Sequence, residues 1–255
     1  MTIESSDSSP IPPRFTIGSK VETPGTLIDM MQEVARALEE AKKDCKPIVR
    51  VDIPLPVTGG TELDDWPGGI RQKYCTLVPM LKETMKALKF SSSKMNEENY
   101  IDDIDAVGLW EDNGYQMCCF PTPDSCSYLK NNFMKWNDDS SMLALINHQM
   151  FLDPMSKQDT KDFLNSATTV YQLEQLNCRG PGALPVRGLA YRQYPGPYLV
   201  CRRLDVGGYV LLKEYADSMP PRPELEELFM EDSKVRDKDL SLLDRLKKQV
   251  PNFGN

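Results

Sequence analysis

Few residues in this sequence are of a type that does acid–base chemistry, and they are scattered along it. The chain has one histidine, His148, and imidazole is the side chain whose ordinary pKa lies closest to neutral pH. His148 follows the apolar run from Ser141 to Asn147, which predicts a strand, and α/β proteins often place functional groups at strand ends. It is therefore a candidate acid or base. The alternative is a histidine hydrogen-bonded at a strand end, because no nucleophile motif of the form G-x-S-x-G is present.

The seven cysteines do not form the pattern of a metal site or a redox pair. None belongs to a C-x-x-C pair, and a single histidine disfavours a structural zinc site. Cys118 and Cys119 are neighbours in a predicted strand, so their side chains should point to opposite faces. Buried thiols in a reducing compartment are the simpler interpretation. The sequence thus predicts no catalytic set, no metal and no cofactor.

A glycine-rich loop offers a candidate ligand site. It runs from Pro56 to Gly69 after a predicted strand, and its last glycines precede a predicted helix, whose free N-terminal amides would attract an anion. Two aspartates in the loop would repel a phosphate unless a metal intervened, and no P-loop or dinucleotide-binding motif is present. An ordinary surface loop is the alternative. The possible ligand-binding residues are Asp64, Asp65, Gly68, Gly69 and His148.

The last third of the chain interleaves arginines with tyrosines. Short predicted strands carry them on both sides of Pro195-Gly196-Pro197. Both residue types are common at binding surfaces, so we expect a docking face for an acidic peptide, a phosphate group or a lipid headgroup. The alternative is a solvated edge sheet with aromatic cross-strand pairs. The predicted partner-binding residues are Arg187, Tyr191, Arg192, Tyr194, Tyr198 and Arg202.

Helical and strand patterns alternate along most of the chain, which is typical of an α/β fold. Apolar spacing predicts helices at about 26–44, 69–89, 124–135 and 156–166, and a loop at 91–99. Apolar runs predict strands at 48–55, 106–110, 115–120, 141–147 and 168–176. Asn113-Gly114 is a strong hairpin signal, and strands at 187–194, 198–204 and 208–215 predict an antiparallel meander. We expect a mostly parallel sheet flanked by helices, with the meander at one edge.

Composition favours one main folded domain. The chain has 255 residues, 40% of them apolar and 27% charged, which suits a globular protein. We expect a flexible segment at 1–25, an α/β domain at 26–218 and an acidic extension at 219–255 with helices at about 224–230 and 238–250. A net charge of −8 argues against general nucleic-acid binding.

Two further expectations concern membranes and targeting. No run approaches the roughly 18 consecutive apolar residues of a membrane helix, so we expect no transmembrane segment, while peripheral membrane association stays open. The N-terminal segment has neither an apolar signal core nor the arginine-rich composition of a transit peptide. We therefore expect any targeting peptide to be absent from this chain.

Three short stretches carry a resemblance to a known family. Val51-Asp-Ile-Pro-Leu-Pro56 is similar to a strand that ends in an acidic-apolar-proline pattern. Leu145-Ile-Asn147-His-Gln149-Met-Phe151 is similar to a strand-end Asn-Pro-Gln-Trp, with His148 in place of the proline and the aromatic residue displaced. Tyr191-Arg-Gln-Tyr-Pro195-Gly196-Pro197-Tyr198 is similar to a strand followed by a Pro-Gly turn and an aromatic residue. In these stretches and in its element order, over about residues 26–229, the chain resembles the domain of unknown function 1995 family of plastids and cyanobacteria.

The resemblance implies a plastid location, in the chloroplast stroma or on the thylakoid surface. Some family members, the low photosystem II accumulation proteins, are linked to photosystem assembly, and in another member the domain is fused to an adenylate kinase. The family brings no catalytic residues to carry over. We therefore expect a non-enzymatic protein that binds a photosystem or another thylakoid complex, or assists its assembly. The alternative is an α/β enzyme or sensor that binds a phosphorylated metabolite or a nucleotide.

Overall fold

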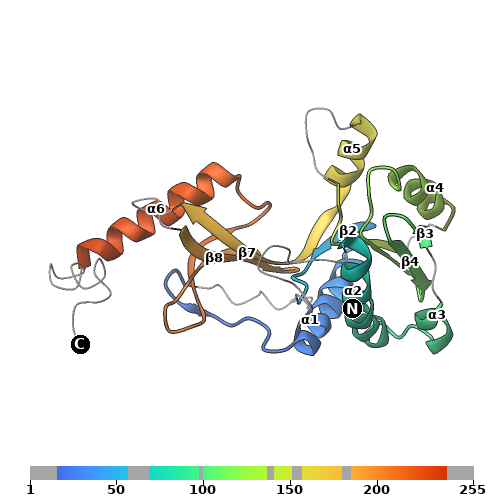
Figure 1. Cartoon of the computed structure of the whole chain (residues 1–255), viewed down its shortest axis with the longest axis horizontal. Helices are drawn as coiled ribbons and strands as arrows, with labels where there is room; N and C mark the ends of the chain where they lie inside the picture. The colour runs from blue at the N-terminus through green and yellow to red at the C-terminus, as the bar shows by residue number, and fades with distance from the viewer. Residues whose placement is uncertain are drawn as a thin grey trace, which may run out of the picture. The chain divides into compact units, whose positions relative to one another are not determined.

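The computed structural model describes residues 16–56, 69–97, 100–136, 141–150, 157–179 and 185–239. Backbone contacts divide the chain into two compact units, each with its own helices and strands (Figure 1). The larger unit holds the described residues within 23–174 and 191–197. The smaller unit holds those within 16–22, 175–190 and 198–239. Two strands, β7 (Thr168–Arg179) and β8 (Pro185–Gln193), contribute residues to both units.

The larger unit is an α/β layer built on a parallel centre. Its helices are α1 (Leu27–Lys43), α2 (Gly69–Ala87), α3 (Ser92–Asn96), α4 (Cys126–Trp136) and α5 (Gln158–Ser166). Its other strands are β2 (Ile48–Asp52), β3 (Tyr100–Asp102), β4 (Val107–Asp112), β5 (Tyr115–Cys119) and β6 (Met142–Ile146). The strand order is β7-β2-β6-β5-β4-β3. The first four of these strands are parallel to one another, and β4 and β3 pair antiparallel.

Local signals in the sequence explain two of these elements. The Thr26 hydroxyl accepts a hydrogen bond from the Asp29 backbone N–H (3.1 Å), so Thr26 caps α1 as its residue type predicts. Asn113 and Gly114, at φ of 49° and 74°, make the tight turn between β4 and β5. Two successive residues at positive φ fit the twist of a two-residue hairpin, which is why Asn-Gly is favoured there. The predicted hairpin at Asn113-Gly114 is confirmed.

Helices cover both faces of the larger unit's sheet. α1 and α2 pack together on one face, and α4 and α5 cover the other (Figure 1). The core beneath α4 and α5 includes Leu129, Phe163, Leu145 and Cys118. Cys119, the next residue, points to the opposite face because successive strand side chains alternate. The paired cysteines therefore do not share a face.

The smaller unit is an antiparallel meander with a helix on one face. It comprises β1 (Lys20–Val21), β9 (Tyr198–Arg203), β10 (Tyr209–Tyr215) and α6 (Arg222–Asp239), with parts of β7 and β8, in the strand order β1-β10-β9-β8-β7. Leu225 and Phe229 of α6 pack on Ala190 and Val200 of the sheet. Gly188 makes this packing possible, because a Cβ there would lie 2.3 Å from the Phe229 ring.

The predicted α/β class is confirmed, but the prediction of a mostly parallel sheet is wrong. The strands of the described residues form a mixed sheet in which most strands pair antiparallel. The Asn113-Gly114 hairpin reverses the chain, and the short strands β1 and β3 extend the antiparallel edges. Neither short strand was predicted, since runs of two or three residues carry no readable alternation.

Other predictions for local structure differ in smaller ways. The stretch predicted as a loop at 91–99 contains α3, and β3 begins at Tyr100. One helix, α6, replaces the first of the two predicted C-terminal helices and extends to Asp239, while residues 240–255 lie outside the described residues. Part of the segment predicted as flexible, Lys20–Val21, forms β1 against β10. The single domain at 26–218 stays a prediction.

All seven cysteines are free; Cys45 and Cys75 are exposed, and the other five are buried: Cys118, Cys119, Cys126, Cys178 and Cys201. No helix in the described part of the chain combines the length and apolar character needed to span a membrane.

Candidate functional site

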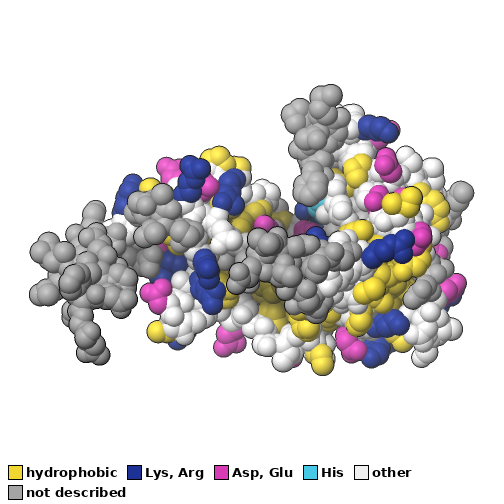
Figure 2. All heavy atoms as spheres, in the orientation of Figure 1, with side chains coloured by type: hydrophobic (Ala, Val, Ile, Leu, Met, Phe, Trp, Pro, Cys, Tyr) yellow, Lys and Arg dark blue, Asp and Glu magenta, His cyan; other side chains and the backbone are white. Residues whose placement is uncertain are grey.

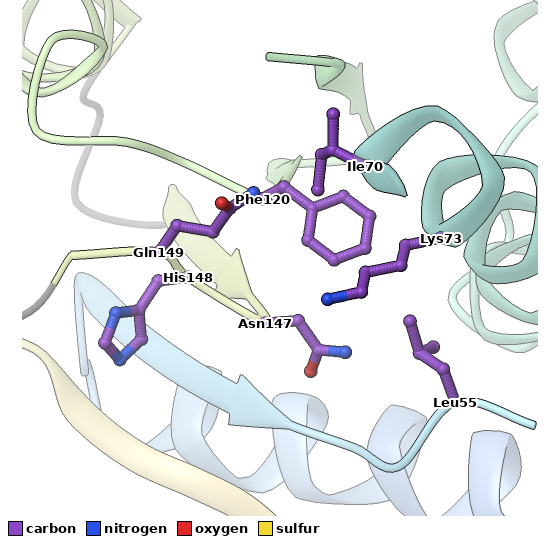
Figure 3. A pocket seen from close by; sticks show the side chains of 7 residues that line it. All are labelled: Leu55, Ile70, Lys73, Phe120, Asn147, His148 and Gln149. Atoms are coloured by element: carbon purple, nitrogen blue, oxygen red, sulfur yellow. The ribbon is translucent and has the colours of Figure 1, made fainter. Parts of the chain in front are cut away.

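A pocket of about 350 Å³ lies in the larger unit at the carboxyl ends of three parallel strands (Figure 3). One side is lined by residues that follow β2, β5 and β6, and the other by the start of α2. Open α/β sheets bind their ligands at this edge, because the loops and helix N-termini converge there. The lining residues are Leu55, Ile70, Lys73, Phe120, Asn147, His148 and Gln149.

Asn147 extends the strand pairing past the end of β6. Its Oδ1 accepts a hydrogen bond from the Ile53 N–H (2.8 Å), and its Nδ2 donates to the Ile53 carbonyl (3.0 Å). Its own N–H donates to the Val51 carbonyl (2.8 Å). The side-chain amide thus takes the place of a backbone peptide between β6 and the segment after β2.

Two lining residues adopt a left-handed backbone. Phe120 has φ of 51° and Asn147 has φ of 48°. Asparagine tolerates this region, but for phenylalanine it is unusual and costs on the order of 1–3 kcal/mol. Strained residues of this kind cluster at binding and catalytic sites. Both turn the chain sharply at the strand ends and so open the pocket.

Polar groups in the pocket favour a ligand that accepts hydrogen bonds. The Nε2 of Gln149 is buried and has no hydrogen-bond partner among the described residues. Lys73, in the second turn of α2, points its Nζ toward Asn147 (Figure 3). The first turn of α2 contains no acidic residue, so the partial positive charge of the helix start is not neutralised by its own side chains. Together these groups favour an anion.

His148 lies at the rim and points away from Asn147 (Figure 3). Its Nδ1 accepts a hydrogen bond from the Met150 N–H (3.3 Å), so the neutral ring carries its proton on Nε2. Burial lowers the pKa of His148, and the nearby Arg50 guanidinium lowers it further, while Asp52 opposes the shift. Arg50 and Asp52 pair with each other at 3.3 Å. His148 is therefore neutral at neutral pH.

The titration of His148 can be checked directly, because it is the only histidine. We expect a single imidazole midpoint in an NMR titration that lies below the ordinary value of about 6.5. The unfolded chain then takes up the proton first as the pH falls, so the free energy of unfolding should decrease below about pH 6.5. Urea unfolding of His148→Gln should lack this part of the decrease. Arg50→Gln should raise the midpoint; a wild-type midpoint above 6.5 would contradict the geometry described here.

The structure describes two of the five predicted ligand-binding residues, and both lie at this edge. His148 lines the pocket, and Gly69 begins α2 with φ of 63°, a conformation that glycine adopts without strain. Asp64, Asp65 and Gly68 lie outside the described residues. The pocket residues Lys73 and Phe120 were not predicted. Asn147 and Gln149 stand in a stretch that carries the family resemblance, but nothing in their type alone indicates a site.

The six predicted partner-binding residues do not all lie on the surface. Tyr191, Arg192 and Tyr198 are buried, and the Tyr191 hydroxyl donates to Glu33 of α1 (3.0 Å). Arg202 forms an ion pair with Asp232 of α6 (2.9 Å). The remaining two are more accessible: the Tyr194 hydroxyl donates to Asp44 (2.6 Å), and Arg187 is exposed.

The described residues give little indication of a reactive thiol or a metal site. Burial raises the pKa of Cys119 to about 12 and also raises that of Cys118, so both thiols are protonated and unreactive. Within the described ranges, no three His, Cys, Asp or Glu side chains gather in a way that could hold a metal ion.

The comparison with known families decides the membership. A family model described as "Domain of unknown function (DUF1995)" matches residues 24–229. The chain belongs to this family. The resemblance noted in the sequence is thereby confirmed, and the DUF1995 match runs from before α1 to Phe229 of α6, so it includes every residue that lines the pocket. No curated protein and no solved structure gave a significant match.

Proposed function

We propose that this DUF1995 protein binds a small phosphorylated metabolite in the pocket at the carboxyl ends of β2, β5 and β6. The observation that carries the proposal is the convergence, in one pocket, of Lys73, the start of α2 and Gln149, whose buried Nε2 has no hydrogen-bond partner in the described part of the chain. A buried amide without a partner costs about 1–3 kcal/mol, and a ligand oxygen would recover this cost once the Gln149 side chain turns its Nε2 into the pocket.

The chemistry of the lining favours binding over covalent catalysis. Backbone amides at a helix start, a lysine and a primary amide all donate hydrogen bonds, and phosphate oxygens accept them. A volume of about 350 Å³ suits a small metabolite. The described lining contains no serine, threonine or cysteine that could serve as a nucleophile. Neutral His148, whose ring points away from Asn147, supplies one donor at the rim, Nε2–H, for the part of the ligand that lies there.

A thermal-shift screen of nucleotides and sugar phosphates, with and without Mg²⁺, tests the proposal. At a ligand concentration of about 100 Kd, binding stabilises the folded state by about 2.7 kcal/mol. For a chain of this size that raises Tm by about 5–10 °C. Lys73→Gln should lose most of this shift, because it removes the charge that faces the ligand. His148→Ala should reduce the shift as well.

Lys82→Gln is the matched control. Lys82 lies on the same helix and hydrogen-bonds to Asn96 (3.0 Å), and it does not line the pocket. This variant removes the same charge and should keep the full ligand shift. Equal loss in both variants would mean that only general charge is sensed, and no shift with any ligand would reject the proposal.

The family membership favours a second candidate, a role in the plastid. The resemblance links some members to photosystem assembly, and we propose as the alternative that this chain binds a thylakoid complex or assists its assembly, without catalysis. Exposed Arg187 and the partly exposed Tyr194 are the predicted contact residues whose side chains a partner could reach. Blue-native gels of thylakoid membranes test this role. Migration with a large complex would support it, and migration only as the free monomer would reject it.

A further inference from the structure

A second pocket lies in the smaller unit, on the sheet face that α6 does not cover. Its volume is about 260 Å³. Residues of β7, β8, β9 and β10 line it, and all of these residues belong to the smaller unit. The lining residues are Gln175, Leu176, Asn177, Arg187, Gly188, Arg203 and Tyr209.

Strand alternation places the polar side chains of this pocket away from α6. Leu176 and Cys178 of β7 pack beneath α6, so Gln175 and Asn177 point to the other face. On β9, Arg202 reaches Asp232 of α6, so its neighbour Arg203 points away.

The same rule applies to the two remaining strands. Val186 and Gly188 of β8 contact the α6 side, so Arg187 between them faces the pocket. Tyr209 of β10 is the direct cross-strand partner of Arg203. Each of the four strands thus delivers a polar side chain to one place.

The two arginines of this pocket differ from three cations on the α6 side of the smaller unit. On the α6 side, Arg202 pairs with Asp232 (2.9 Å), Lys213 with Glu224 (3.3 Å), and Arg222 with Glu226 (3.0 Å). Arg187 and Arg203 are exposed and form no hydrogen bond or ion pair with any described residue. Figure 2 shows Lys and Arg side chains, with Asp and Glu among them, on the surface of the molecule.

We infer that this pocket, which we call the two-arginine pocket, binds a phosphate monoester. Two like charges that line one pocket repel each other, and an oxyanion between them would remove this cost. Guanidinium groups match phosphate oxygens with paired hydrogen bonds, and the Tyr209 hydroxyl and the amides of Gln175 and Asn177 add further donors.

The size of the two-arginine pocket limits the ligand. Its 260 Å³ lies just below the range of about 300–1,000 Å³ that is usual for drug-sized ligands. It therefore admits a phosphate with a few attached atoms, on either a soluble metabolite or a lipid headgroup. This site is separate from the pocket of the proposed function, because the two share no lining residue.

Titration of the full chain with glycerol 3-phosphate tests the inference. The Nε–Hε NMR signals of Arg187 and Arg203, assigned by their absence in Arg187→Gln and Arg203→Gln, should shift on addition of the ligand. Each variant should bind about tenfold more weakly, because a charge-assisted hydrogen-bond pair is lost. The affinity of Arg203→Lys should lie between those of the wild type and of Arg203→Gln, since lysine keeps the charge but loses the paired N–H donors of the guanidinium group.

The matched control is Lys213→Gln, which removes one charge from the same sheet on the opposite face. It should leave the affinity unchanged. Lys73→Gln should also bind glycerol 3-phosphate at the two-arginine pocket, because Lys73 lines only the other pocket. The inference can therefore hold even if the proposed function is rejected. Equal weakening in Lys213→Gln and Arg203→Gln would overturn the inference.

Vesicles distinguish the two sources of phosphate. Phosphatidylcholine vesicles with and without phosphatidic acid are floated with the protein. Flotation that requires phosphatidic acid and both arginines identifies the lipid headgroup, whereas arginine shifts with glycerol 3-phosphate alone identify the soluble source. Unmoved arginine signals together with no flotation would overturn the inference.

Discussion

Replacing Gly188 by alanine is expected to destabilise the smaller unit by about 3 kcal/mol, the upper end of the usual cost of overpacking. The added Cβ would lie 2.3 Å from the Phe229 ring and 2.6 Å from the Cys201 carbonyl oxygen. The ring is fully buried, and the oxygen belongs to a neighbouring strand, so neither can move freely. Urea unfolding, followed by circular dichroism and by amide exchange in β8 and β9, measures the loss.

Two further variants make this result interpretable. In Gly25→Ala the nearest atom to the new Cβ would be an Asp29 carboxylate oxygen at 3.8 Å, so stability should hardly change. Phe229→Leu removes the ring with which the new Cβ of Gly188→Ala clashes. The double variant should therefore lose less stability than the sum of the two single variants. A Gly188→Ala protein as stable as the wild type would show that α6 does not pack as described.

Asn147→Ala is expected to cost about 2–3 kcal/mol and to abolish ligand binding in the pocket beside it. The variant leaves the Ile53 N–H and carbonyl without the partners that Asn147 supplies at 2.8 and 3.0 Å. It also places alanine at φ of 48°, which lacks the tolerance of asparagine for that region. The free energy of unfolding and the thermal shift with the best ligand are measured together.

Substitutions at the same position separate the hydrogen bonds from the backbone strain. Asn147→Gly relieves the strain but loses both side-chain hydrogen bonds, whereas Asn147→Asp keeps the acceptor for the Ile53 N–H and loses the donor. We expect Asn147→Asp to be the more destabilised of the two, because its second carboxylate oxygen would face the Ile53 carbonyl oxygen in place of the lost donor. If Asn147→Gly were fully stable, the side-chain pairing with Ile53 would not matter.

Strong local signals predicted the fold's elements well. Thr26 before α1 and Asn113-Gly114 between β4 and β5 act through neighbouring backbone, so the sequence alone reveals them. Strand direction is different, since it depends on which strands pair at long range. β5 pairs antiparallel with β4 and parallel with β6, and nothing within its own residues indicates either direction.

The site was harder to predict because it depends on side-chain direction and on strained turns. His148 and Gly69 were found from residue type and from their place after a strand or before a helix. Phe120 carries no such signal, since a left-handed phenylalanine is imposed by the surrounding structure. Similarly, Tyr191 and Arg192 looked like one surface, but both side chains are buried. Composition cannot tell which strand faces are covered by helices.

Two exposed cysteines offer sites for attaching spectroscopic labels. Only Cys45 and Cys75 are exposed among the seven free cysteines, and both belong to the larger unit. A maleimide dye or nitroxide would therefore attach at these two positions without prior mutagenesis. In a Cys45→Ser protein a single label on Cys75 would report on α2, the helix whose start lines the pocket.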